Sequence, residues 1–230
     1  MEYSVFKTKP FRNRKYLHLN VLCLINMGEY SLKEQYSIMF DQMMVANAGY
    51  FRISEVIASG IDRIHAYEWL SIRTDIEKAA KGLYVKKNIQ KDLFYILSYA
   101  HKNVIFSHRS ALYLNKISDV PVLKPDVTVK ARYNVSSINK SCNVFQADEK
   151  YLDIGKIAVL SPSMHKVNCY DPERTVCDII RKKSKMGSDV LKRTIRSYFE
   201  SDSKDIKKLF EYAEIFGIKD KVLSYSEILN

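Results

Sequence analysis

The sequence has 230 residues, 47% of them hydrophobic, which is enough to build one large domain or two modest ones. It contains only 7 glycines and 5 prolines, so an all-β protein rich in tight turns is not expected and helices should dominate. The 37 Lys and Arg residues exceed the 26 Asp and Glu residues, and the net charge of +11 creates a positive field that attracts polyanions such as nucleic acid or an anionic membrane surface.

Residues 1–29 are assigned as an N-terminal extension, which belongs to the native protein only if translation starts before Met27. The apolar stretch 16–27 is interrupted by His18 and Asn20 and no small-residue cleavage site follows, so a signal peptide is not expected. The stretch is also too short to span a bilayer as a helix. The 4 cysteines are widely spaced without a CxxC pair, which fits core residues in a reducing compartment. We therefore expect a cytoplasmic protein without a membrane partner.

The first predicted domain covers residues 30–87 and begins with a helix over 31–46. Apolar residues recur there at three- and four-residue spacing, which is the periodicity of one helix face. Ser31 followed by Glu34 forms a capping box that marks the start of this helix. A very short extended piece is predicted at 50–51.

Two further helices follow in this domain. The first is predicted over 54–59 with Ser54 as its N-cap. Gly60 comes next, at a point where the chain needs a residue at positive φ. The second is predicted over 62–73, with Asp62 as its N-cap.

The first domain closes with a predicted hairpin of strands 75–79 and 83–85, in which Gly82 permits the turn. The domain therefore runs as helix, short strand, helix, glycine turn, helix and basic hairpin. That is the element order of a winged helix-turn-helix. We accordingly predict an α+β protein with an N-terminal winged helix-turn-helix domain.

Several residues of this domain are candidates for contact with duplex DNA. The start of the last helix of such a domain enters the major groove, and the hairpin contacts phosphates. Arg63 can bind guanine or a phosphate, while His65 and Tyr67 can reach bases or phosphates. The alternatives are a solvated Arg63, a Tyr67 that packs in the core with Trp69, and a hairpin whose lysines are merely solvated. The candidates are Arg52, Arg63, His65, Tyr67, Arg73, Lys78, Lys81, Lys86 and Lys87.

The second predicted domain covers residues 88–230 and is a larger mixed α/β domain with a helical C-terminal end. Ser107 is predicted to cap one of its helices, and Pro172 opens another in its first turn. Its predicted helices are 89–101, 107–114, 172–183, 188–199, 203–216 and 225–229, and its predicted strands are 104–106, 127–131, 143–146, 157–160 and 166–170.

The densest run of charge in the chain lies in this second domain, where Asp189 alone opposes seven basic residues. Such a surface can meet phosphates, RNA or an acidic protein face, and a solvated helix face is the alternative interpretation. The basic residues are Arg181, Lys182, Lys183, Lys185, Lys192, Arg193 and Arg196.

Enzyme signatures are missing from the sequence. There is no phosphate-binding glycine loop, HExxH or GxSxG motif, and the 5 histidines lack metal-ligand spacing. Ser107 and His108 are adjacent, but neighbouring residues in a helix point in different directions, so they are not expected to act together. The segment 126–130 resembles half of a nuclease site, yet it lacks the acidic residue two positions before Lys130. We therefore expect no catalytic residue, metal or cofactor, with a nuclease as the enzyme alternative.

Three segments together resemble the AbiEi-type antitoxins. Segment 47–87 is similar to the family's winged-helix domain, from a Gly-aromatic start to a hairpin that closes on Gly-Leu-Tyr at 82–84. VIFSHRSALYL at 104–114 is similar to its strand followed by a Ser-His-x-Ser-Ala-Leu-Tyr helix. YDPERTVCDII at 170–180 is similar to its Pro-Glu-Arg-Thr signature. The resemblance covers residues 30–230.

The same motifs also have a purely structural interpretation. Arg174 is expected to pair with Asp178, four residues further along the helix, and Glu173 to favour the helix dipole. The apolar members of the motifs are expected in the core. These are Leu112, Tyr113, Val176 and Ile179.

The resemblance implies an antitoxin of a type IV toxin–antitoxin system, through which bacteria restrict phage by abortive infection. Its first domain would bind inverted repeats of double-stranded DNA in the promoter of its own operon and repress it. Residues 88–230 would neutralise a nucleotidyltransferase-like toxin without a stable complex, and the protein would be a monomer in solution. The alternative is a winged-helix transcriptional regulator with a ligand-sensing or dimerising C-terminal domain.

Overall fold

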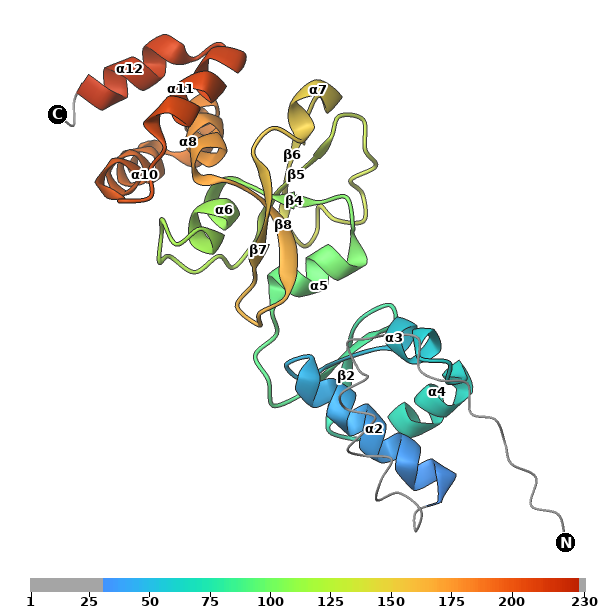
Figure 1. The fold of residues 1–230 in the computed structure, drawn as a ribbon. Coiled ribbons are helices and arrows are strands. Elements are labelled where there is room, and N and C mark those ends of the chain that lie inside the picture. Colours follow the sequence, from blue (N-terminus) through green and yellow to red (C-terminus); the bar gives the residue numbers. More distant parts are fainter. Residues whose placement is uncertain (1–30, 228–230) are drawn as a thin grey trace, which may run out of the picture. The chain divides into compact units, whose positions relative to one another are not determined.

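The computed structural model describes residues 31–227 and divides the chain between Lys91 and Asp92 into two compact units. Each unit contains helices and one β-sheet (Figure 1), so the prediction of a mixed α+β protein is confirmed. The predictions for the apolar stretch 16–27 and for Met27 lie outside the described residues. Within the described part of the chain, no helix is both long and apolar enough to cross a membrane.

The N-terminal unit combines helices with a small antiparallel sheet. The strand order of this sheet is β1-β3-β2, and the β2–β3 hairpin turns at Gly82, whose φ is 76°. A positive φ is readily adopted by glycine, which has no Cβ to clash with the following carbonyl. The elements are α2 (Leu32–Ala46), β1 (Tyr50–Arg52), α3 (Ile53–Ala58), α4 (Arg63–Ser71), β2 (Ile76–Ala80) and β3 (Leu83–Lys86).

Two of the three predicted helix starts in this unit have the expected caps. Ser31 and Glu34 form the capping box of α2, with the Glu34 carboxylate 2.8 Å from the Ser31 amide nitrogen. Asp62 caps α4 by accepting a hydrogen bond of 2.9 Å from the amide of Ile64. The prediction of Ser54 as a cap is wrong, because β1 runs directly into α3 and its last residue, Arg52, occupies the N-cap position without a side-chain bond.

Aromatic rings form the centre of the N-terminal core. Phe40 from α2, Phe51 from β1 and Trp69 from α4 lie with ring centroids 4.9–5.4 Å apart in tilted and edge-to-face arrangements. All three are at most 5% exposed, so Trp69 is a core residue. Tyr67 is 40% exposed, which excludes the alternative that it belongs to this core. The same ring cluster therefore fixes which side of α4 faces inward.

The C-terminal unit is built on a five-stranded mixed sheet. The strand order is β6-β5-β4-β8-β7, in which β4 and β8, and also β5 and β6, are parallel. Its elements are α5 (Leu93–Ala100), β4 (Ile105–Phe106), α6 (His108–Leu114), β5 (Asp126–Lys130), β6 (Asn143–Ala147), α7 (Glu149–Leu152), β7 (Lys156–Leu160), β8 (Lys166–Tyr170), α8 (Pro172–Arg181), α9 (Lys183–Met186), α10 (Ser188–Glu200), α11 (Ile206–Ile215) and α12 (Lys219–Glu227).

Two hydrophobic clusters hold the C-terminal unit together. One joins the sheet to α5 and α6, and the other joins α8 to α10, α11 and α12. Figure 1 shows these last four helices (orange to red) gathered into one group. Helix α8 is buried at every residue from 173 to 180, so it lies at the centre of the helical part.

Several predicted boundaries in this unit are wrong. Helix α5 begins at Leu93 rather than at residue 89, because Asp92 caps it through the amide of Tyr95 at 3.1 Å. The last helix begins at Lys219 rather than at residue 225, and α7 was not predicted. Cys142, Cys169 and Cys177 are free thiols in the core, as expected.

Candidate functional sites

The outward face of α4 is open to solvent. Arg63, Ile64 and Tyr67 are exposed, while Ala66 and Trp69 on the inward face are buried. The Arg63 guanidinium lies 5.7 Å from the centroid of the Tyr67 ring. No carboxylate among the described residues forms an ion pair with Arg63. Its charge is therefore not engaged by a carboxylate in the described part of the chain.

His65 lies at the junction of α4 with α2. Its ring centroid is 5.0 Å from that of Tyr36, and its Nδ1 is 3.5 Å from the Glu68 carboxylate. With 43% of its side chain exposed, it lines a shallow pocket together with residues of α2. His65 is thus partly engaged with its own unit, unlike Arg63.

Two of the nine DNA-contact candidates are held by internal ion pairs. Arg52 pairs with Glu55 on the following turn. Arg73 donates two hydrogen bonds of 2.7 and 2.8 Å to Asp75 and one of 2.7 Å to Asp41, and it lies over the Trp69 ring. The Arg73 hydrogen bonds lower the pKa of Asp75 to about 2. These guanidinium groups brace the N-terminal unit.

The β2–β3 hairpin carries a concentration of positive charge. Lys78 and Lys81 are exposed on it, and Lys87 is exposed directly after it. Lys86 is half-buried at the end of β3. The one acidic residue of the hairpin, Glu77, pairs with Lys91 at 3.0 Å. The hairpin therefore presents ammonium groups with little opposing charge.

The basic run of the C-terminal unit extends from the end of α8 to α10. Arg181 donates a hydrogen bond of 3.3 Å to Asp178 and lies 4.9 Å from the centroid of the Phe216 ring, so it is attached to the unit. The other six residues of the run are exposed, as Arg181 is. They are Lys182, Lys183, Lys185, Lys192, Arg193 and Arg196.

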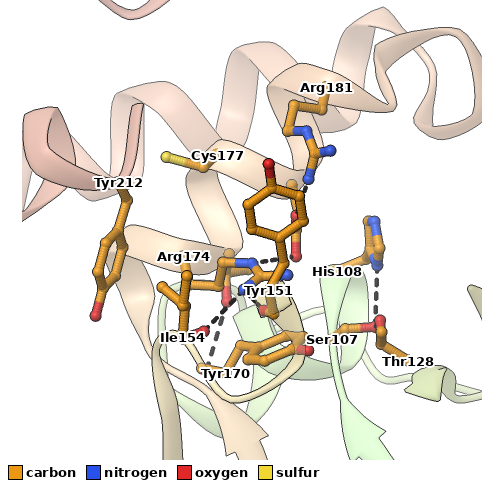
Figure 2. Close-up of polar contacts among 12 residues, drawn as sticks. Ser107, His108, Thr128, Tyr151, Ile154, Tyr170, Arg174, Cys177, Arg181 and Tyr212 are labelled. Atoms are coloured by element: carbon orange, nitrogen blue, oxygen red, sulfur yellow. Dashed lines mark hydrogen bonds and ion pairs between the residues drawn. The ribbon is translucent and has the colours of Figure 1, made fainter. Parts of the chain in front are cut away.

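Arg174 occupies the buried polar centre of the C-terminal unit (Figure 2). Its Nε donates a hydrogen bond of 2.9 Å to Asp178, which confirms the predicted pair. Its Nη1 donates to two main-chain carbonyls of the 151–154 turn at 2.7 and 2.8 Å. The guanidinium also lies against the rings of Tyr170 and Phe216 at 4.2 and 4.4 Å. This residue of the Pro-Glu-Arg-Thr motif therefore joins the strand region to the helices.

Glu173 in the same motif makes specific contacts beyond any effect on the helix dipole. Its carboxylate accepts a hydrogen bond of 3.1 Å from the Tyr198 hydroxyl and one of 3.2 Å from the Asp205 amide. Three of the four apolar residues expected in the core are buried, namely Leu112, Val176 and Ile179. The fourth, Tyr113, is only half-buried. Most of the motif therefore has a structural role.

Asp126, in the segment that resembles half of a nuclease site, is fully buried and saturated. One carboxylate oxygen accepts hydrogen bonds from the Arg109 amide and side chain, and the other accepts from Asn143 and Arg109. Ser107 occupies the N-cap position of α6 as predicted, but its side chain makes no capping bond, and the Asp126 carboxylate accepts the hydrogen bond of the Arg109 amide instead. Lys130 pairs with Glu149 at 2.6 Å.

His108 is the site residue that sequence reasoning missed. Adjacent side chains were expected to diverge, yet His108 Nδ1 lies 3.0 Å from Ser107 Oγ, which in turn lies 2.9 Å from the Thr128 hydroxyl. Ser107 is extended and His108 has a φ of 48°, so regular helical geometry does not apply to this pair. The ring stacks on Phe145 with centroids 3.7 Å apart. Burial lowers the pKa of His108 to about 4, so the imidazole is neutral at neutral pH.

Among residues 31–227, no group of three or more His, Cys, Asp or Glu side chains is arranged to hold a metal ion. The sequence matches no protein-family model, and a search of curated proteins finds no significant relative.

Proposed function

We propose that this protein is the antitoxin of a type IV toxin–antitoxin system, and that its N-terminal unit is a winged helix-turn-helix that represses the operon. The order α2–β1–α3–α4–β2–β3 and the turn at Gly60, whose φ is 89°, support this assignment. In it, α4 is the recognition helix and the β2–β3 hairpin is the wing.

The observation that carries the proposal is the solvent-facing side of α4 beside a lysine-bearing hairpin. A helix enters the major groove with its exposed face, and Arg63 can then fork onto guanine O6 and N7. Ile64, 60% exposed, offers an apolar contact for a thymine methyl group. Lys78, Lys81 and Lys87 then supply phosphate contacts, which release counterions. Because Arg52 and Arg73 hold internal pairs, we assign them to bracing these elements.

Fluorescence anisotropy with a duplex from the protein's own promoter tests the repressor role. The full chain should bind this duplex more tightly than a scrambled duplex of equal length, with affinity that falls steeply as salt rises. Arg63→Ala should weaken specific binding by about tenfold or more, since a bidentate base contact contributes about 1–3 kcal/mol. Lys81→Gln should lower the slope of log affinity against log salt by about 1.

Lys102→Gln is the matched control for Lys81→Gln. Lys102 is an exposed lysine of the C-terminal unit, so the same loss of charge there should leave the binding curve unchanged. Emission from the buried Trp69 reports whether each variant of the N-terminal unit stays folded. Equal affinity for promoter and scrambled duplexes at physiological salt would refute the repressor role.

The antitoxin role belongs to the C-terminal unit and is tested separately. Co-expression with a nucleotidyltransferase-like protein encoded by the neighbouring gene should restore growth. If the basic run acts, the triple variant Lys183→Glu, Lys192→Glu, Arg196→Glu should lose this rescue. Lys221→Glu, an exposed lysine outside the run, is the control. Unchanged rescue by the triple variant would remove the basic run from the mechanism.

One feature favours the second candidate function, a transcriptional regulator whose C-terminal unit senses a small molecule. The cavity beside His108 lies in that unit and is lined by polar and charged side chains. The neighbouring gene separates the two candidates, because a sensor needs no toxin partner. Absence of a toxin-like neighbour would favour the regulator over the antitoxin.

A further inference from the structure

A cavity of about 260 Å³ opens beside His108 in the C-terminal unit. Its walls come from the start of α6, the strands β5 and β6, the 146–151 segment and the end of α8. Figure 2 shows the His108 ring on one side of this space and the Arg181 side chain extending from α8 on the other. Elements far apart in the sequence thus enclose one polar pocket.

The buried imidazole offers this cavity one unpaired nitrogen. His108 is 2% exposed and lines the cavity, and its Nε2 has no hydrogen-bond partner among the described residues. Buried polar side-chain atoms in proteins nearly always have a partner, so an unpartnered ring nitrogen in a polar cavity points to a ligand or solvent position.

The neighbouring hydroxyls determine which role that nitrogen plays. The Thr128 hydroxyl donates to Ser107 Oγ, so the single Ser107 proton is free to donate to His108 Nδ1. With Nδ1 as the acceptor, a neutral imidazole carries its proton on Nε2. This arrangement uses every donor of the fully buried Ser107. It makes Nε2–H an unpartnered hydrogen-bond donor on a residue that lines the cavity.

The charged residues around the cavity are positive on balance. Arg174, Arg181 and Lys182 line it, together with Asp178 and Asp148. Asp178 already accepts hydrogen bonds from both arginines, so its charge is compensated within the wall. The exposed ammonium of Lys182 has no ion-pair partner among the described residues. An imidazole N–H beside the unpaired ammonium of Lys182 is a donor set that suits an oxyanion.

We propose that this cavity binds the phosphoryl group of a small molecule, either inorganic phosphate or a mononucleotide. His108 Nε2–H and Lys182 donate to its oxygens, and Arg181 adds charge from the end of α8. A volume of about 260 Å³ accommodates a phosphate with part of an attached group. This inference is independent of DNA binding and of toxin neutralisation.

Isothermal titration calorimetry of the full chain with phosphate, AMP and adenosine tests the proposal. Phosphate and AMP should bind saturably at millimolar concentration, and adenosine should not. Tighter binding of AMP than of phosphate would identify a mononucleotide, and equal binding would identify the free ion. Binding of adenosine as tight as that of AMP, or no saturable binding of either phosphorylated compound, would overturn the proposal.

Two variants remove single donors, and one serves as a matched control. His108→Asn keeps a residue that tolerates positive φ and deletes Nε2, so affinity should fall about tenfold. Lys182→Gln should weaken binding by about fivefold, whereas Lys183→Gln, an exposed neighbour that does not line the cavity, should not. Equal losses for both lysine variants would indicate general attraction to the basic surface and contradict the site.

The protonation state of His108 provides a measurement that does not depend on binding. Long-range ¹H–¹⁵N spectra of the histidine side chains should show His108 as the Nε2–H tautomer. They should also show its signals shifting when phosphate is added. A proton on Nδ1 instead would make Nε2 an acceptor and would exclude the proposed donor.

Discussion

Arg63 in the N-terminal unit and Arg174 in the C-terminal unit show two opposite uses of one side chain. Arg174 is 1% exposed, and its guanidinium bonds to a carboxylate and two carbonyls between two aromatic rings. Arg63 is exposed, has no ion pair within the described residues and lies 5.7 Å from the centroid of the Tyr67 ring. A buried, fully bonded arginine builds the fold, whereas an exposed and unpaired one is available for recognition.

This contrast extends to the surrounding units. The polar residues of the Pro-Glu-Arg-Thr motif find their hydrogen-bond partners elsewhere inside the C-terminal unit, so these residues have a structural role. The lysines of the β2–β3 hairpin have few internal partners, although nothing in their spacing is distinctive.

The single tryptophan of the chain, Trp69, lies in the N-terminal unit, so its emission follows that unit alone while circular dichroism follows both.

The largest expected effect comes from Arg174→Met. The change leaves one carboxylate oxygen of Asp178 and two carbonyls without their Arg174 donor in the interior, which should destabilise the C-terminal unit by about 3–5 kcal/mol. Urea unfolding should show an earlier transition by circular dichroism and an unchanged transition by Trp69 emission. Arg196→Met, at an exposed arginine, should change stability by no more than about 0.5 kcal/mol. Equal shifts of the unfolding transition for Arg174→Met and Arg196→Met would contradict the structural role assigned to Arg174.

The buried His108 of the C-terminal unit predicts how the stability of the protein depends on pH. Burial lowers its pKa from 6.5 to about 4, so between these values the unfolded chain binds a proton that the folded chain does not. The stabilising contribution is complete above pH 6.5 and is lost as the pH falls toward 4, with a magnitude of about 3 kcal/mol. His108→Asn should flatten this part of the stability profile measured by circular dichroism. An identical profile would show that the folded protein protonates His108 as readily as the unfolded chain.

Two glycines with positive φ distinguish close packing from backbone strain alone. A Cβ at Gly155 would lie 2.6 Å from Arg174 Cβ, while one at Gly60 would meet nothing within 4 Å. Gly155→Ala should therefore cost about 2–3 kcal/mol in the C-terminal unit, and Gly60→Ala about 1 kcal/mol in the N-terminal unit. Urea unfolding read by circular dichroism and by Trp69 emission measures both. A larger loss of stability for Gly60→Ala than for Gly155→Ala would contradict the close packing assigned to Gly155.

A small effect, no larger than that at Gly60, is expected at Arg73, whose partners lie near the surface. Side chains of Asp41 and Asp75 are 42% and 51% exposed, so Arg73→Gln should cost about 1 kcal/mol. The cost should shrink in concentrated salt, where exposed charges are screened. Trp69 emission measures it directly, because the guanidinium lies 4.7 Å from that ring. A loss as large as that of Arg174→Met, unaffected by salt, would abolish the distinction between the two environments.

Local features of the fold could be predicted from the sequence because neighbouring residues determine them. The capping box at Ser31, the Asp62 cap and the pairing of Arg174 with Asp178 all involve residues within four positions of each other. The positive φ of Gly60 was also predictable, since it follows a short helix.

Features that depend on distant partners could not be predicted. The Asp126 side chain accepts a backbone hydrogen bond at the start of α6 from 17 residues away, whereas the side chain of the N-cap residue Ser107 makes no such bond. Arg73 is partly neutralised by Asp41, 32 residues away. The cavity at His108 requires β5, β6 and α8 to converge and a backbone conformation that is rare for a histidine. Each of these is fixed by the tertiary fold and leaves no local pattern.

The central position of the two-residue strand β4 has a consequence for how the chain folds. β4 pairs in parallel with β8, joining Phe106 to Cys169, so the middle of the sheet cannot close until the segment between them has been synthesised. In the described part of the N-terminal unit, the pairing of β1 with β3 joins Tyr50 to Val85 over a shorter span, so this sheet can form while the ribosome is still translating the rest. Loop closure over so many residues slows folding, so the sheet should form after the first unit is complete. During that interval the apolar faces of the unfinished sheet are exposed, so aggregation of the chain is expected most at this stage of biosynthesis.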